Sequence, residues 1–232
     1  HAPGISTDII ISTTDTKNTL KRNAHYKCNS SLSINDAIKS ALNEIINGGR
    51  IILLDGTYTV DYDKGPILID EGNITIEGSG WSTVLKSSVK NNTECSILQI
   101  TASNVTLKNM MIASNNPTTA APLILQQKDG TMYENLFFIL TSTLSSTGGC
   151  GIKGTGNCSF TRINNCRIYK TVSESTGLPT FDYGYATNFS GTIHECFHSD
   201  GRTNITVRFA NTTQQNSTNI STSQTTNTIL SV

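Results

Sequence analysis

The sequence is poor in charged and aromatic residues. Only 15% of its 232 residues are charged and 6% are aromatic, and 17 basic residues balance 17 acidic ones. Binding to nucleic acid or to an anionic membrane surface calls for a basic stripe or run, and the chain contains neither. We therefore expect no nucleic-acid partner.

Long hydrophobic runs are also missing. A membrane-spanning helix needs roughly 20 consecutive apolar residues, whereas the longest runs here, IILL and LFFIL, have the length of β-strands. The opening HAPG has no initiator Met and no signal-peptide pattern follows it, which is typical of a start exposed by processing. We expect no membrane span.

The cysteines include no C-x-x-C pair, so a zinc ribbon is not expected. Their even number favours disulfides, which persist in oxidising compartments outside the cytosol. The six cysteines are Cys28, Cys95, Cys150, Cys158, Cys166 and Cys196.

Asparagine, serine and threonine are abundant and together make up 82 of the 232 residues. They form N-x-S/T sequons, the acceptors of N-glycans in secreted proteins. Since such a composition also generates sequons by chance, it is their position beside turn-like segments that favours a glycosylated surface. We predict an extracellular protein, secreted or at the cell surface, with covalent N-glycans and no cofactor. The ten sequons begin at Asn29, Asn73, Asn91, Asn104, Asn157, Asn188, Asn204, Asn211, Asn216 and Asn219.

Five stretches of the chain repeat one pattern at steps of about 30 residues, each with three short strands and polar turns. A small or polar residue separates the last two strands, and it is Gly78, Asn109, Asn135, Asn165 and Glu195 in turn. Two positions earlier stand the apolar residues Ile76, Leu107, Tyr133, Ile163 and Ile193. One position later stand Ser79, Met110, Leu136, Cys166 and Cys196.

Columns that recur at a near-constant step indicate stacked rungs, because each turn of a coil places the same side chain above its predecessor. Strand alternation directs the column of Ile76 inward. The same alternation directs the residues before the turn outward, which are Lys108, Glu134, Asn164 and His194. The predicted fold is all-β, a parallel β-helix.

An amphipathic helix is expected before the repeat, in SINDAIKSALNEIINGG. Ile34, Ile38, Leu42 and Ile45 share one helical face, and Ser33 is a suitable N-cap. We predict a short capping helix at about 33–47 that covers the open end of the coil and its unpaired strand edge. The predicted domains are an N-terminal arm (1–32), the β-helix (33–209) and a polar C-terminal arm (210–232).

INDAIKSALNEIINGGRIILLDGTYTV, followed by ILIDEGNITIEGSG, resembles the opening of the pectin-lyase-like superfamily. That superfamily contains pectate lyases, polygalacturonases and phage tailspikes, and the resemblance, over roughly residues 33–208, implies a single-stranded right-handed parallel β-helix. It implies no single function, since the fold hosts enzymes, adhesins and structural proteins. Asn109, Asn135 and Asn165 look like the family's inward asparagine ladder, in which stacked amides bond from rung to rung. The tolerance of Asn for a left-handed turn is the alternative.

The stacked rungs also suggest cysteine pairs. Cys166 and Cys196 occupy one column on successive rungs, so their Cα atoms should lie about 4.8 Å apart, within disulfide range. Cys150 and Cys158 enclose the turn-rich GIKGTGN, and Cys28 would then pair with Cys95. Other pairings stay open, and buried free thiols are the alternative for Cys166 and Cys196.

Residues 194–198 read HECFH and match the H-E-x-x-H signature of zinc proteases. In those enzymes a helix brings both histidines to one face. Here the motif falls on the turn column of the fifth repeat, where an extended chain separates His194 and His198 by about 13 Å. We predict no metal site.

No catalytic constellation is evident. The resemblance implies Asp residues with a His and an R-x-K segment for polygalacturonases, and a calcium-binding Asp cluster with an Arg for pectate lyases. The nearest candidates lack the paired-carboxylate spacing of glycosidases and are typical of a solvated loop. These candidates are Asp182, His198, Asp200 and Arg202. We predict no catalytic residue and no enzyme activity.

The favoured function is a secreted, glycosylated structural protein whose copies form an extracellular filament, sheath or surface layer. The β-prone patches Ile9–Ile11 and Thr228–Leu230 suggest assembly by strand exchange between subunits, with pairing along their own coil as the alternative. A polysaccharide-binding or polysaccharide-degrading β-helix is the alternative function, and it would display a row of aromatics. The candidates for that row are Tyr133, Tyr169, Phe181, Tyr183 and Tyr185.

Overall fold

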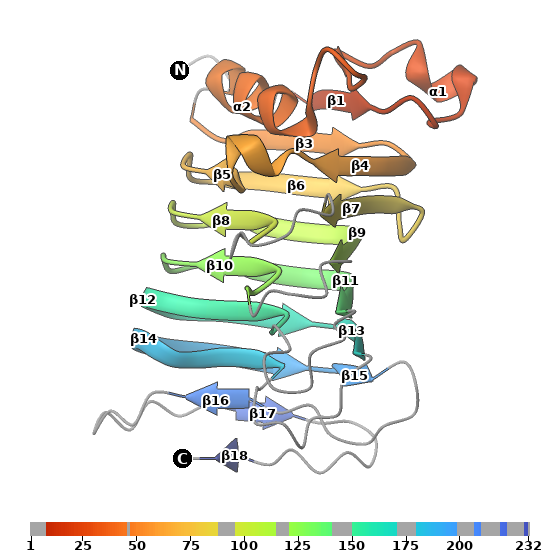
Figure 1. Cartoon of the computed structure of the whole chain (residues 1–232). Coiled ribbons are helices and arrows are strands. Elements are labelled where there is room, and N and C mark those ends of the chain that lie inside the picture. The colour runs from red at the N-terminus through yellow and green to blue at the C-terminus, as the bar shows by residue number, and fades with distance from the viewer. Residues whose placement is uncertain are drawn as a thin grey trace.

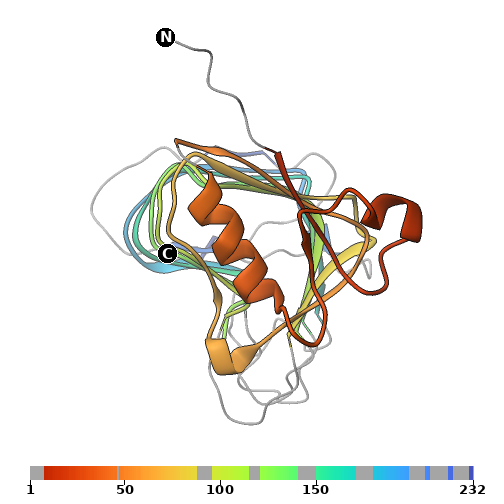
Figure 2. The ribbon, with the colours of Figure 1, turned by 90° about the horizontal axis from the view of Figure 1, so that it is seen from above.

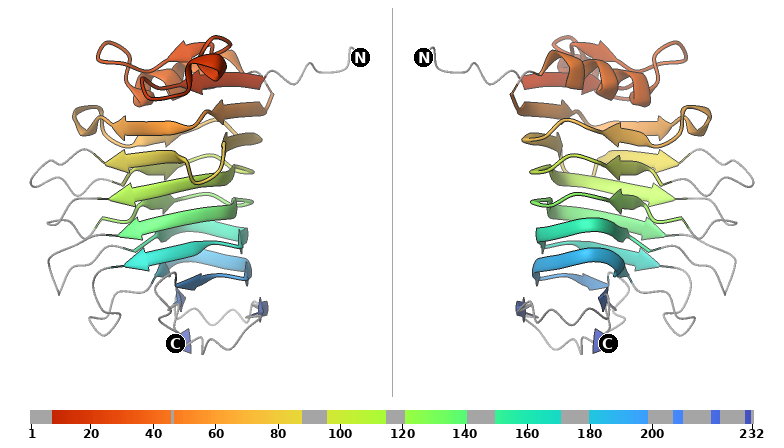
Figure 3. Two further views of the ribbon diagram at one scale, coloured as in Figure 1. Left: turned by 90° about the vertical axis from the view of Figure 1, so that its right-hand side faces the viewer. Right: turned by 90° about the vertical axis from the view of Figure 1, so that its left-hand side faces the viewer.

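The structure, a computed structural model, describes residues 8–45, 47–87, 96–114, 121–140, 150–170, 180–198, 207–209, 219–221 and 230–231. Within them the chain winds as a parallel β-solenoid with three strand-bearing faces (Figure 1). Every strand pair among these residues is parallel, as in β3 (Gly49–Leu53) with β6 (Ile74–Gly78), and the rungs stack in one column (Figure 3). The predicted all-β parallel coil is confirmed.

The first face begins with β1 (Asp8–Ser12) and continues through β3 and β6. Below β6 the first face continues with the first residues of β9 (Thr106–Ser114) and β11 (Met132–Leu140). It then uses the last residues of β12 (Ile152–Asn164) and β14 (Phe181–His194) and ends with β17 (Asn219–Ser221).

The second face starts with β4 (Gly56–Val60) and β7 (Thr83–Ser87), continues through the ends of β9 and β11, and reaches β13 (Arg167–Lys170) and β15 (Phe197–His198). The third face also has parallel strands and includes the starts of β12 and β14. Its other strands are β5 (Ile67–Ile69), β8 (Leu98–Ile100), β10 (Ile124–Gln126), β16 (Val207–Phe209) and β18 (Leu230–Ser231).

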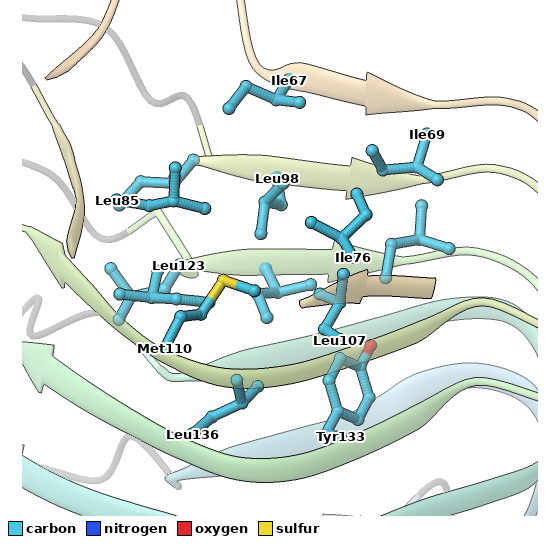
Figure 4. Packing of buried hydrophobic residues seen from close by; sticks show 14 of the residues in the cluster. Ile67, Ile69, Ile76, Leu85, Leu98, Leu107, Met110, Leu123, Tyr133 and Leu136 are labelled. Atoms are coloured by element: carbon cyan, nitrogen blue, oxygen red, sulfur yellow. The ribbon is translucent and has the colours of Figure 1, made fainter. Parts of the chain in front are cut away.

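The predicted inward column exists and is longer than expected. Ile76 pairs with Leu107, Leu107 with Tyr133, Tyr133 with Ile163 and Ile163 with Ile193. Each of these side chains is buried, and Figure 4 shows the first three stacked in the core. The register adds Ile51 above and, above that, Ile9 from β1.

The neighbouring column differs from the prediction at one place. Met110 and Leu136 are register partners, as expected, but Val84 pairs with Met111, so Thr83 rather than Ser79 stands above Met110. The reason is a longer turn in this rung, residues 79–82, between β6 and β7. Thr83 is fully buried, and its Oγ1 donates to the carbonyls of Leu53 and Leu54 at 3.2 and 3.1 Å.

The N-terminal end of the coil is covered. Helix α2 (Ile34–Glu44) lies across it (Figure 2), contacts β4 and β5, and has Ser33 as its N-cap, whose side chain accepts from Asp36 N–H. Its buried face includes Ile34, Ile38 and Leu42, as the sequence predicts. The other short elements are α1 (Asn18–Lys21), β2 (Tyr26–Lys27) and the 3-10 turn η1 (Tyr62–Lys64).

The described strands of the N-terminal and C-terminal arms pair with other strands of the same chain. Such pairing is the alternative to strand exchange between subunits given in the sequence analysis. β1 pairs with β2 and β3, and Ile9 and Ile11 are core residues. At the other end β16 and β17 pair with β14, and β18 pairs with β16. The parallel strand pairing therefore extends beyond the predicted limits of 33–209 in both directions.

Candidate glycosylation edge

The turns from the third face to the first form one edge of the coil, on the left of Figure 1, which we call the sequon corner. Four residues stack there with left-handed backbones, at φ 58°, 60°, 68° and 58°. Their backbone N–H groups bond from rung to rung, for example from Asn104 to Asp129 O at 3.1 Å. The stacked residues are Asn73, Asn104, Gly130 and Phe160.

Four of the predicted glycosylation sites lie on this corner, and all four residues are exposed: Asn73, Asn104, Asn157 and Asn188. Asn157 and Asn188 are register partners on adjacent strands. Asn29, also exposed, precedes α2, and Asn219 begins β17. The other sites lie outside the described residues: Asn91, Asn204, Asn211 and Asn216.

Local hydrogen bonds orient two of the sequon amides. Asn157 Oδ1 accepts from the Ser159 hydroxyl at 2.8 Å and from Ser159 N–H at 3.3 Å. Asn29 Oδ1 likewise accepts from the N–H groups of Ser31 and Leu32, at 2.7 and 3.0 Å. In both, the oxygen is held near its own sequon, which leaves Nδ2, the atom that carries an N-glycan, without a hydrogen-bond partner among the described residues.

The upper pair of the corner is arranged differently. Asn104 Nδ2 donates to Asn73 Oδ1 at 3.3 Å, so one of the two sugar-accepting nitrogens already bonds to its neighbour. Adjacent strands lie about 4.8 Å apart, which brings two potential glycan stems very close together.

A second corner, between the first and second faces, corresponds to the predicted turn column. Asn109, Asn135, Asn165 and Glu195 all have left-handed backbones there. Asn135 Nδ2 donates to Asn109 Oδ1 at 2.8 Å, and Asn109 Nδ2 to Glu77 Oε1 at 3.1 Å. We call it the asparagine corner. It shows both the expected amide stack and the left-handed turn, although Asn165 is exposed rather than inward.

The second face lies across the coil from the sequon corner (Figure 1). Its strands place apolar side chains on the outer surface. One outward column runs from Val84 through Met111 and Phe137, and the next contains Ala113, Ile139 and Tyr169. All but Ala113 are partly or fully exposed to solvent. The sequence analysis did not identify this surface, although the apolar run LFFIL, too long for one inward face, was its signal.

Trp81, in the longer turn, adds to this outer surface. Its ring lies 5.4 Å from that of Phe137 and 4.3 Å from the Arg167 guanidinium, and its Nε1 donates to Asn135 O at 3.3 Å.

The predicted disulfides are not formed among the described cysteines of this structure, which are Cys28, Cys150, Cys158, Cys166 and Cys196. Cys95 lies outside the described residues. Cys166 and Cys196 nevertheless stand on adjacent rungs, since Asn164 pairs with His194 and Arg167 with Phe197. Each thiol donates to a backbone carbonyl instead, Cys166 to Asn164 O at 3.3 Å.

Burial makes these thiols poor nucleophiles. It raises the pKa of Cys28 to about 11 and that of Cys158 to about 12. The pKa of Cys166 also lies well above the ordinary thiol value, because the side chain is buried and lies against Cys196. Since the thiolate is the reactive form, none of the three has the environment of a catalytic cysteine.

The candidate catalytic and metal residues are not brought together. His194 ends β14, Glu195 is the left-handed turn residue and His198 ends β15, so the segment HECFH lacks the helix that a zinc protease needs. Asp182 is buried on the third face, away from His198 on the second, and Asp200 and Arg202 lie outside the described residues. The described part of the chain has no group of three potential metal ligands.

The expected row of aromatics is not formed either. Tyr133, Phe181 and Tyr183 are fully buried, and the hydroxyls of both tyrosines donate to Gln126 Oε1 at 3.1 Å. Tyr169 and Tyr185 are exposed but lie on different faces. The burial of Tyr133 agrees with its place in the predicted inward column, and Phe181 and Tyr183 lie in a strand whose register the repeat did not define.

A small open cleft of about 210 Å³ lies between the N-terminal segment and β4. Its walls include Cys28, Tyr58 and several hydroxyl side chains, and no charged residue lines it. Burial raises the pKa of both titratable side chains in the cleft, Cys28 and Tyr58.

Neither α-helix in the described residues is long and apolar enough to cross a bilayer. Comparison with protein-family models, with curated proteins and with solved structures gave no match.

Proposed function

We propose that the protein is an extracellular, glycosylated structural protein of pectin-lyase-like architecture, without catalytic activity, whose copies pack side by side. The observation that supports this most directly is an asymmetry of its surface. Four exposed sequons line one corner, and the outward apolar columns occupy the face across the coil. Glycans on that corner would project away from the apolar face, so that a second copy of the protein could still pack against that face.

The outer surface of the second face has the composition of a protein interface. Aromatic residues, Met and Arg are enriched in such interfaces, and Trp81, Met111, Phe137 and Arg167 are gathered here. The first face is polar by contrast: Arg50 bonds to Asp8 at 2.6 Å and to Glu77 at 3.3 Å, and Lys108 bonds to Glu77 at 3.3 Å. Lateral assembly through the second face therefore replaces strand exchange as the mode of self-association.

The predicted disulfides remain part of this proposal. In an oxidising compartment, Cys166 and Cys196 are placed on neighbouring strands for a bridge, with two electrons and two protons passing to an oxidant such as a disulfide-exchange catalyst. Peptide mapping of the secreted protein without reduction would detect the bridged peptide.

The assembly is tested with two substitutions on one strand. Ile139 and Met132 are both half-exposed residues of β11, but Ile139 faces outward on the second face and Met132 on the first. We expect the protein to form ordered assemblies in sedimentation and electron microscopy, Ile139→Glu to be monomeric, and Met132→Glu to assemble normally. Monomeric protein at all concentrations, or equal effects of the two substitutions, would contradict the proposal.

Glycosylation is tested separately by the intact mass of secreted protein, compared with protein made in a host without the glycosyl transferase. We expect a mass excess that maps to peptides containing Asn29 and Asn157.

A further inference from the structure

We propose that Phe160 is a built-in platform on which the first sugar of a glycan on Asn157 stacks. The inference rests on the glycosylation proposed above and assigns a binding role to a residue that neither the core nor the turn explains.

Phe160 is anomalous in its backbone. It occupies the left-handed column of the sequon corner at φ 58°, where the rungs above use Asn73, Asn104 and Gly130. Asn and Gly adopt this conformation readily, whereas a bulky aromatic there is an outlier that is strained. Residues held in such conformations cluster at functional sites.

Phe160 is also anomalous in its exposure. Its side chain is 72% exposed, the most exposed large apolar residue in the described part of the chain. The ring makes no aromatic or cation contact among those residues, unlike Phe137 with Trp81 or Phe189 with Tyr183. Neither hydrophobic burial nor backbone preference accounts for a phenyl ring at this position.

The backbone around the ring is nonetheless fixed. Phe160 N–H donates to Ser190 Oγ on the next rung at 3.0 Å, and Gly130 N–H donates to the preceding carbonyl, of Ser159, at 2.8 Å. Cys158 and Thr161 on either side are fully buried. The ring is therefore presented to solvent from a rigid edge rather than from a loose loop.

Asn157 lies three residues earlier on the same strand and is exposed. Because both hydrogen bonds from Ser159 hold its Oδ1, the Nδ2 atom is oriented away from them. In N-glycosylation this nitrogen exchanges one hydrogen for the anomeric carbon of an activated sugar, and the diphosphate of the sugar donor leaves. From this nitrogen the first sugar ring would extend along the sequon corner toward the phenyl face of Phe160, three residues away on the same strand.

A pyranose ring has a face of C–H groups, and the face of an aromatic ring is its electron-rich side, so the two attract each other and exclude water. Asn188, the register partner of Asn157, is also exposed but has no side-chain hydrogen bond that fixes it among the described residues. The geometry therefore favours Asn157 as the site of the stacked glycan.

The experiment compares glycosylated protein with protein from a host lacking the transferase, for the wild type, Phe160→Leu, Asn157→Gln and Asn188→Gln. Phe160→Leu keeps an apolar side chain at an exposed position, so the variant is expected to fold. We expect the glycan to raise the wild-type Tm by roughly 2–4 °C, as a contact of ordinary strength does in a domain of this size. The increment should be at least halved in Phe160→Leu and Asn157→Gln and unchanged in Asn188→Gln.

A second readout is independent of stability. Ring currents should shift the C–H protons of the first sugar on Asn157 upfield in NMR spectra, and Phe160→Leu should abolish the shift. If Asn157 carries a glycan, but its sugar protons are not shifted and the Tm increment does not depend on Phe160, the stacking on Phe160 is overturned while the proposed glycosylation stands. Loss of the coupling in Asn188→Gln instead of Asn157→Gln would overturn the assignment, and an absence of glycan at every sequon would overturn the proposed function as well.

Discussion

The two corners that border the first face both turn the chain from one strand-bearing face to the next, but they do so with different residues. At the asparagine corner a single left-handed residue turns the chain in the rungs of Asn109, Asn135 and Asn165, and the amide of Asn135 bonds to that of Asn109. At the sequon corner the upper rungs have turns of four or five residues, 70–73, 101–105 and 127–131, whereas β12 and β14 pass the corner without a break. Its left-handed column accepts Asn, Gly and Phe.

The difference shows which corner is constrained by packing. Buried side chains follow both corners at once, Met110 at the asparagine corner and Val105 at the sequon corner, but at Gly78 the asparagine corner leaves no room even for a Cβ. The sequon corner faces solvent and tolerates longer turns, exposed amides and a strained aromatic. Geometry is fixed at one corner, and the other is available for modification.

The largest expected effect comes from crowding the asparagine corner. A Cβ on Gly78 would lie 2.3 Å from Asn109 O and 2.8 Å from Met110 Cβ, so Gly78→Ala forces the backbone of two rungs apart. We expect a loss of about 1–3 kcal/mol in unfolding free energy, measured by thermal denaturation followed by circular dichroism.

Gly130→Asn is the matched change at the sequon corner. There the nearest atom to a Cβ is the flexible amide of Asn104, the Asn104 backbone N lies 3.2 Å away, and Asn already occupies this column twice. We expect a change within about 0.5 kcal/mol. Equal losses at Gly78 and Gly130 would remove the contrast between the corners.

A smaller effect separates the two explanations of the asparagine column. Asn135→Ala removes the amide bond to Asn109, worth about 1 kcal/mol, and also places Ala in a left-handed turn, which costs about as much again. Asn135→Gly removes the amide but relieves the backbone. We expect urea unfolding to rank the variants wild type, Gly, Ala in falling stability.

If Asn135→Gly equals the wild type, the column exists for its backbone alone. If Gly and Ala are equally destabilised, the amide stack alone explains it.

The smallest effect at neutral pH, where it is absent, is that of the Cys158 thiol beside the sequon corner on the stability of the fold. Cys158 holds its proton in the folded state with a pKa of about 12, raised by burial from 9.0. Between pH 9 and 12 the unfolded chain therefore loses this proton while the folded chain keeps it, so stability falls as pH rises through that window.

Alkylation gives the direct measurement of this thiol. At pH 8 the native Cys158 should react with iodoacetamide at least about a hundredfold more slowly than in guanidinium, because both its thiolate fraction and its exposure are low. Comparable native and unfolded rates would show that the sequon corner opens readily.

The stacking of the rungs was predictable because a single column of inward side chains specifies it. The apolar residues from Ile76 to Ile193 recur at every turn, and only a coil places them in register. The same pattern could not reveal the insertion at 79–82, since Ser79 directly follows the turn column in the aligned repeats. The outward surfaces were less predictable. Tyr183 and Phe160 look alike as isolated aromatics, yet one is buried against Gln126 and the other stands in solvent.

The N-terminal end has a consequence of its own. Ile10 N–H donates to His25 Nδ1 at 3.0 Å, and the backbone N–H of His25 donates to Ile10 O at 2.8 Å. An imidazole thus fills the bonding position that a visiting strand would need, and it does so only while that ring nitrogen carries no hydrogen. This end of the coil is therefore blocked at Ile10, which favours the side-by-side packing proposed above over stacking of a second copy onto this end.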